Sequence, residues 1–76
     1  MIQGDKFNVT GVVWKKINKT QESVETVLGV CKFCEKFFSV DERGEASKIL
    51  HGVGNIILKH ECGAEEKFLV DDLRKM

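Results

Sequence analysis

Four side chains of metal-binding type lie in two short clusters of the sequence. Cys31 and Cys34 are separated by two residues, and His60 and Cys62 are separated by one. Two cysteines at this spacing can hold one metal ion from a tight turn, and a second turn with a histidine and a cysteine completes a tetrahedral shell. Three sulfurs and one nitrogen form a donor set that suits zinc. The sequence therefore predicts one structural Zn²⁺ bound by these four residues.

A second histidine leaves an alternative ligand set open. His51 would have to replace His60 or Cys62, but 16 residues separate it from Cys34 and eight separate it from His60, which fits finger spacing poorly. We expect His51 to be a partly exposed polar residue before a glycine loop. A redox role for the first cysteine pair is also less favoured, because a thioredoxin-like CxxC opens a helix and this one lies between strand-like segments.

The two clusters resemble the knuckles of zinc ribbons. In that family two strand-turn-strand knuckles face each other across one Zn²⁺, usually with Cys-x2-Cys in both. The first cluster matches this spacing, whereas in the second the position three before Cys62 is Lys59 and the candidate ligand is His60. Gly63 matches the small residue that often follows such a cysteine. The resemblance covers about residues 27–70 and implies a small all-β fold with antiparallel hairpins around the metal.

The chain is short enough for a metal to decide whether it folds. It has 76 residues, with 42% hydrophobic and 32% charged residues, which is typical of a globular protein. A domain of this size buries only about 60% of its unfolded surface, so its stability is marginal without a cross-link such as a bound metal ion. We expect a single domain over residues 1–76, with an N-terminal β-hairpin at 7–30 and a zinc-binding core at 27–70.

Strand-like segments flank both clusters. Segments 7–14 and 23–30 are rich in β-branched and aromatic residues and predict a hairpin that leads into the first turn. Segment 36–40 is expected to leave that turn as a strand. Segments 56–60 and 67–70 are expected to enter and leave the second turn in the same way.

Three details of these elements are open to test. The alternation within 23–30 predicts one strand face that carries Val24, Thr26, Leu28 and Val30. Residues 45–51 fit either two helical turns ended by Gly52 or a strand paired with 56–59, and the β-rich surroundings favour the strand. Residues 71–76 are expected to form a short helical turn or a frayed end.

The sequence does not predict an enzyme. A catalytic zinc needs three protein ligands, an open coordination position and a nearby general base. Glu61 lies between two proposed ligands and is the candidate base, but we expect its side chain to point into solvent. So short a chain also has little room for a substrate pocket. No catalytic residue and no small-molecule substrate are therefore expected.

Two surfaces are candidates for binding a partner. Trp14 beside Lys15, Lys16 and Lys19 would stack a base and hold phosphates. With the zinc-ribbon resemblance, this implies binding to nucleic acid or to the transcription machinery. The alternative is that Trp14 belongs to the core and the lysines form a solvated turn. Phe33, at the tip of the first knuckle, would instead anchor a protein partner, unless it packs back on the strands.

Charge does not single out either partner. The net charge is zero, which argues against strong non-specific binding to nucleic acid. Residues 1–36 carry six lysines and four acidic residues, whereas residues 37–76 carry six basic and eight acidic residues. No apolar run approaches the roughly 18 residues of a membrane span, and no signal peptide is visible. We expect a cytoplasmic protein with reduced thiols that binds nucleic acid or, alternatively, a protein.

Overall fold

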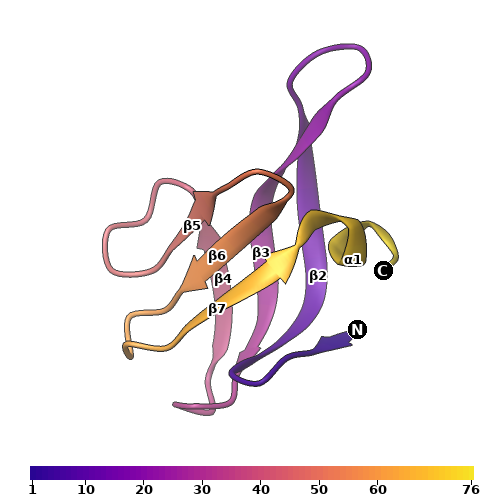
Figure 1. Cartoon of the computed structure of the whole chain (residues 1–76). Coiled ribbons are helices and arrows are strands. Elements are labelled where there is room, and N and C mark those ends of the chain that lie inside the picture. The colour runs from indigo at the N-terminus through magenta and orange to yellow at the C-terminus, as the bar shows by residue number, and fades with distance from the viewer.

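Seven strands form two antiparallel sheets, as the computed structural model of residues 1–76 shows (Figure 1). The first sheet has the order β1-β2-β3-β4, with β1 at Ile2–Gln3, β2 at Phe7–Lys16, β3 at Glu22–Cys31 and β4 at Phe37–Asp41. The second has the order β5-β6-β7, with β5 at Lys48–His51, β6 at Asn55–Lys59 and β7 at Glu65–Leu69. One short helix, α1 at Val70–Arg74, follows β7. The predicted small all-β fold with antiparallel hairpins is confirmed.

The β2-β3 hairpin sets the long dimension of the molecule. Phe7 lies opposite Cys31 at one end of the pair, and Lys16 lies opposite Glu22 at the other. Ten residues at about 3.3 Å each place these ends about 30 Å apart. Figure 1 shows the loop between β2 and β3 projecting beyond the rest of the chain. The turn that carries Cys31 and Cys34 and the lysine-rich segment therefore lie at opposite ends of one hairpin.

The side-chain alternation predicted for β3 is wrong after Val24, because a β-bulge interrupts the strand. Trp14 pairs with Val24 and Val13 pairs with Thr26, so Glu25 is an extra residue between the two pairs. An extra residue reverses the face on which all later side chains lie. Beyond the bulge, the buried side chains are therefore those of Val27 and Cys31 rather than those of the predicted face. The bulge thus turns the side chain of Cys31 toward the interior.

The segment 45–51, for which the sequence allowed a helix or a strand, contains the strand β5, as favoured from the sequence. β5 pairs antiparallel with β6, from Lys48 opposite Lys59 to His51 opposite Ile56, and the helical alternative does not form. Gly54, with φ of 73°, occupies the connecting turn in a conformation that favours glycine. The two-residue strand β1 was not predicted. No helix in the chain is long and apolar enough to span a membrane.

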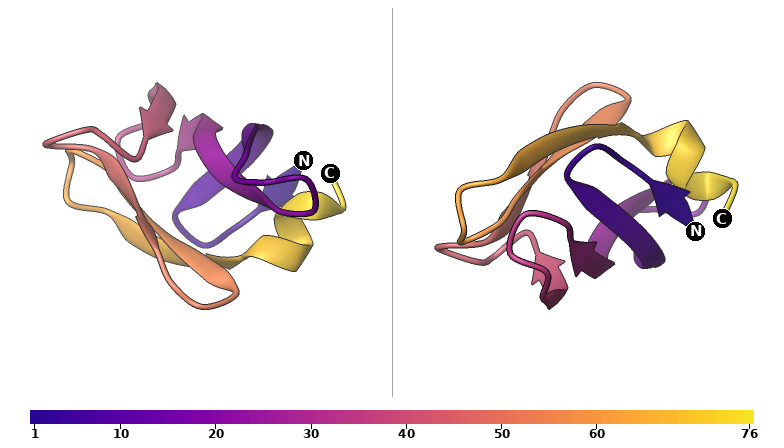
Figure 2. Two further views of the ribbon diagram at one scale, coloured as in Figure 1. Left: turned by 90° about the horizontal axis from the view of Figure 1, so that it is seen from above. Right: turned by 90° about the horizontal axis from the view of Figure 1, so that it is seen from below.

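One small hydrophobic cluster fills the space between the sheets. Figure 2 shows the second sheet crossing over the first, with both termini on the same side. Only 15 of the 76 residues are buried, so the apolar core of this chain is limited and a cross-link between the sheets would add much to its stability. The cluster consists of Phe7, Val9, Val24, Val27, Cys31, Phe38, Val40, Ile49, Ile56, Leu58, Ala64, Phe68 and Leu73.

A carboxylate fastens the N-terminal turn to the second sheet. Glu66 in β7 accepts hydrogen bonds from the backbone N–H groups of Asp5 (2.9 Å), Lys6 (2.8 Å) and Phe7 (3.1 Å). Gly4 leaves room for it, because a Cβ at that position would lie 2.5 Å from Glu66 Oε2. This contact ties the start of β2 to β7.

Replacing Glu66 by glutamine should lower the free energy of unfolding by about 1–2 kcal/mol, because three charge-assisted hydrogen bonds are lost or weakened. The matched control is Glu65→Gln, whose carboxylate makes only a surface ion pair with Lys59 at 3.3 Å. Such a pair contributes about 0–1 kcal/mol. Urea denaturation measures both variants, and equal effects would contradict the role assigned to Glu66.

Candidate metal centre

The four predicted ligands come together where the β3-β4 turn of the first sheet meets the β6-β7 turn of the second sheet. Cys31 ends β3 and Cys34 lies in the turn that leads to β4, whereas His60 and Cys62 lie in the turn between β6 and β7. Their ligand atoms all lie within 4.8 Å of one another. The fold therefore assembles three sulfurs and one imidazole nitrogen at a single point.

The spacing of the donor atoms suits a tetrahedral ion. Cys31 Sγ lies 3.5 Å from Cys62 Sγ, and His60 Nδ1 lies 3.1 Å from Cys62 Sγ and 3.7 Å from Cys34 Sγ. Zinc–sulfur bonds of about 2.3 Å and zinc–nitrogen bonds of about 2.0–2.1 Å give tetrahedral edges of about 3.6–3.8 Å. The separations of 3.5 Å and 3.7 Å are close to these edges, and the His60–Cys62 separation of 3.1 Å is shorter. All three cysteines are free thiols. The group can therefore hold one metal ion, and its donor chemistry fits zinc.

Both turns contain one residue with a positive φ at the equivalent position. Glu35 has φ of 60° and Gly63 has φ of 96°, and each directly follows the second ligand of its turn. In the first turn the Glu35 N–H donates to the Cys31 carbonyl at 2.7 Å, and in the second the Gly63 N–H donates to the His60 carbonyl at 2.9 Å. The sequence marks Gly63 only as a small residue after a cysteine, and neither positive φ was predicted; glycine tolerates this conformation, whereas glutamate rarely adopts it.

Burial and backbone hydrogen bonds shift the pKa values of the Cys31 and Cys62 thiols in opposite directions. Burial raises the pKa of the Cys31 thiol, but hydrogen bonds from the backbone N–H groups of Cys34 and Phe33 and from Cys62 bring the pKa below its ordinary value. At Cys62 the backbone N–H of Ala64 lowers the pKa, but burial and the neighbouring Cys31 sulfur raise it above its ordinary value. A cation between the sulfurs would relieve the cost of a second thiolate.

Two aromatic rings hold the histidine in place. His60 is 7% exposed, and its ring centroid lies 6.4 Å from that of Phe7 and 5.8 Å from that of Phe38. The Nδ1 atom faces the sulfurs of the group. Glu61, the candidate general base, is exposed as expected, and its backbone N–H donates to Ser47 Oγ at 2.8 Å. The side chain between the two ligands is thus at the surface.

The alternative ligand set is not assembled. His51 is exposed, and its Nε2 lies 3.1 Å from Glu42 Oε2 instead of in the cysteine group. Lys15 pairs with the same carboxylate and, together with His51, holds the pKa of Glu42 below its ordinary value. His51 is therefore a polar surface residue at the distal end of β5.

The residues predicted to bind nucleic acid do not form one open face. Trp14 is half-buried against the core, and the Arg74 guanidinium lies 5.1 Å from its ring centroid. Lys15 is paired with a carboxylate, as described above. Lys16 and Lys19 are exposed near the tip of the hairpin. One face of the Trp14 ring is thus already covered by a cation.

Two exposed phenyl rings lie in and just after the Cys31–Cys34 turn. Phe33 is 72% exposed at the tip of the turn, so it does not pack back on the strands. Phe37, at the start of β4, is 87% exposed, whereas its neighbour Phe38 is buried. Sequence reasoning missed Phe37, because alternation within 36–40 does not show which of two adjacent phenylalanines faces the core.

The fold and the candidate site of this chain are described by its own strand pairing and side-chain positions. No protein family, no curated protein and no solved structure matches the chain. Its two antiparallel sheets and its Cys3His group make it a small all-β protein with a candidate site for one metal ion.

Proposed function

We propose that this chain is a zinc-stabilised binding module of the zinc-ribbon type, without catalytic activity. The observation that carries the proposal is the Cys3His group, whose donor atoms join the β3-β4 turn to the β6-β7 turn. One Zn²⁺ held by Cys31, Cys34, His60 and Cys62 would link the two sheets. Four protein ligands leave no open position, which is the property of a structural site. Such a thiolate site is suited to a reducing compartment such as the cytoplasm.

The surface beside the metal supports a protein partner. Phe33 in the first turn and Phe37 at the start of β4 are largely exposed. Exposed aromatic side chains are common anchors of protein interfaces. The metal would fix the turn that carries them, and a rigid anchor loses less entropy on binding than a mobile one. We therefore propose that a protein with an apolar pocket covers these two rings.

Binding to nucleic acid or to the transcription machinery is the second candidate. Lys16 and Lys19 make no ion pair and lie near the tip of a projecting hairpin, where they would reach phosphates. The covered ring of Trp14, the pairing of Lys15 and the zero net charge rank this candidate below protein docking.

Matched surface variants separate the two candidates. A protein partner captured by the wild type should be lost with Phe33→Ala/Phe37→Ala and retained with Val53→Ala, a 99% exposed apolar residue in the β5-β6 turn. A partner that binds all three proteins equally would rule out the aromatic surface. For nucleic acid, fluorescence anisotropy with a labelled oligonucleotide at low salt should show binding that Lys16→Glu/Lys19→Glu weakens. No binding at low salt would remove this candidate.

A further inference from the structure

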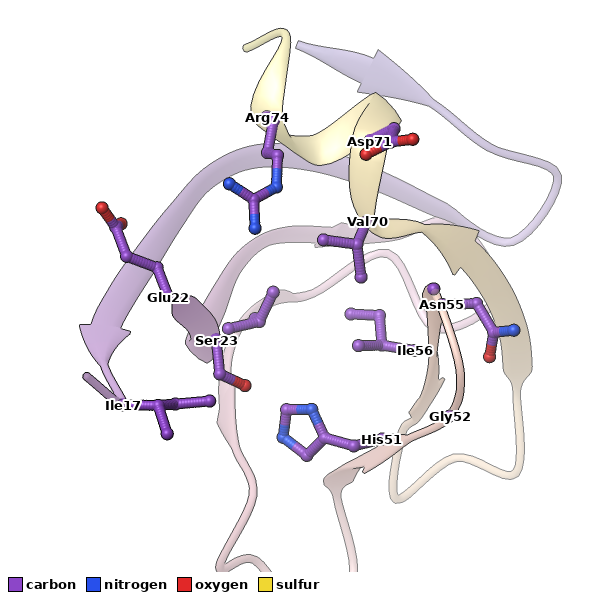
Figure 3. A pocket seen from close by; sticks show the side chains of 12 residues that line it. Ile17, Glu22, Ser23, His51, Gly52, Asn55, Ile56, Val70, Asp71 and Arg74 are labelled. Atoms are coloured by element: carbon purple, nitrogen blue, oxygen red, sulfur yellow. The ribbon is translucent and has the colours of Figure 1, made fainter. Parts of the chain in front are cut away.

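An open cavity of about 390 Å³ lies at the end of the molecule opposite the metal centre. It is formed by the tip of the β2-β3 hairpin, the turn between β5 and β6, and helix α1 (Figure 3). Its apolar lining includes Val24, Ile56 and Val70, with the 62% exposed Ile17 at its rim. The volume lies within the range of about 300–1,000 Å³ that is usual for sites of small ligands.

Arg74 provides a cation directed at this cavity. Figure 3 shows its guanidinium pointing from α1 into the space between the walls. Stacking over Trp14 at 5.1 Å restrains the side chain, and Arg74 makes no ion pair with any carboxylate of the chain. Glu22 and Asp71 also line the cavity, but Figure 3 shows their carboxylates directed away from its centre. The donors of the guanidinium therefore remain available to a ligand.

The wall opposite Arg74 is also polar. His51 and Ser23 lie across the cavity from the guanidinium (Figure 3). The His51 ring is held by its 3.1 Å contact with Glu42, and Lys15 pairs with that same carboxylate. The cavity thus combines one restrained guanidinium, two hydrogen-bonding side chains and an apolar floor.

We propose that this cavity binds a carboxylate carried on a short aliphatic body. The guanidinium fork of Arg74 would bind both carboxylate oxygens, and the aliphatic part would cover Ile17 and pack on Val24 and Ile56. A small aliphatic acid and the C-terminal residue of a peptide share this chemistry. The inference goes beyond the proposed function, because neither the metal ligands nor Phe33 and Phe37 contribute to the cavity.

Titration of the isotope-labelled full chain, followed by two-dimensional NMR, tests this proposal. The probes are N-acetyl-leucine, an acetylated tripeptide that ends in leucine with a free carboxylate, and the C-terminal amide of that tripeptide. We expect saturable shifts of the Ser23, Gly52 and Arg74 amides with both acids, and binding about tenfold or more weaker for the amide. Tighter binding of the peptide acid would identify a peptide end as the source of the ligand, and tighter binding of N-acetyl-leucine a free acid. No saturable shift with either acid, or equal binding of acid and amide, would overturn the proposal.

Variants at two neighbouring positions assign the carboxylate contact. Arg74→Gln should weaken binding of the acids about tenfold, and Arg74→Lys should weaken it less because it keeps the charge without the planar fork. The control is Lys75→Gln, whose side chain lies 4.0 Å from Asp72 and does not line the cavity. Wild-type affinity in Arg74→Gln would overturn the proposal. Metal content measured on the same samples separates a failure of the cavity from a failure of the metal site.

Discussion

Replacement of Cys62 by serine is expected to remove the metal and to leave most of the chain unfolded. The Cys62 sulfur lies 3.5 Å from Cys31 Sγ and 3.1 Å from His60 Nδ1, so it contacts two other candidate ligand atoms. Structural zinc contributes about 10–16 kcal/mol of apparent folding free energy in small zinc-binding peptides. A core as small as this one supplies at most about 3–5 kcal/mol by itself. Loss of one ligand should therefore remove more stability than the core provides.

Far-UV circular dichroism and NMR dispersion in the presence of zinc measure this effect. Glu61→Ser is the matched control, because Glu61 lies in the same turn, is exposed and contributes no ligand atom. Its backbone N–H can still donate to Ser47 Oγ. A Cys62→Ser protein that is as well folded as Glu61→Ser would contradict a structural metal at this site.

Truncation of Phe7 to alanine is expected to cost about 3–5 kcal/mol of unfolding free energy at fixed zinc concentration. The Phe7 ring is 0% exposed and lies edge-on to Phe38, with centroids 5.4 Å apart at 76°. It also lies against the His60 ring, so the cavity left by truncation would loosen a metal ligand as well as the core. The lost packing in the core and the loosened His60 both lower the free energy of unfolding.

Chemical denaturation of the zinc-loaded protein measures this loss. The control is Phe37→Ala, which removes the same side chain from an 87% exposed position and should change the unfolding free energy by less than about 0.5 kcal/mol. Similar losses in the two variants would mean that Phe7 is not the buried link between the first sheet and the second turn.

The four residues of the Cys3His group could be predicted because their chemistry is local to each cluster. Cysteine spacing within a turn and a histidine beside a third cysteine are visible without knowledge of the fold. The competing position of His51 could also be judged from its spacing, and its contact with Glu42 agrees with that judgement. Strand segments flanking both turns followed from β-branched and aromatic residues, and the observed strand ends differ from the predicted ones by only one or two residues.

The remaining features depend on contacts between distant segments. The extra residue Glu25 changes the face on which Cys31 lies, and only the pairing with β2 shows it. The covering of Trp14 depends on Arg74, which lies 60 residues further along the chain. Burial of one phenylalanine of the 37–38 pair depends on the register of β4 against β3. Local patterns carry none of this information.

The most direct test of the metal site is metal analysis of the purified protein combined with Co²⁺ substitution. We expect one metal ion per chain, tetrahedral d–d bands and strong thiolate-to-metal charge transfer. The spectrum should change in His60→Ala and stay the same in His51→Ala, because His51 contacts Glu42 and lies outside the cysteine group. A purified protein that holds no metal and nevertheless keeps its fold would contradict a structural metal in this chain.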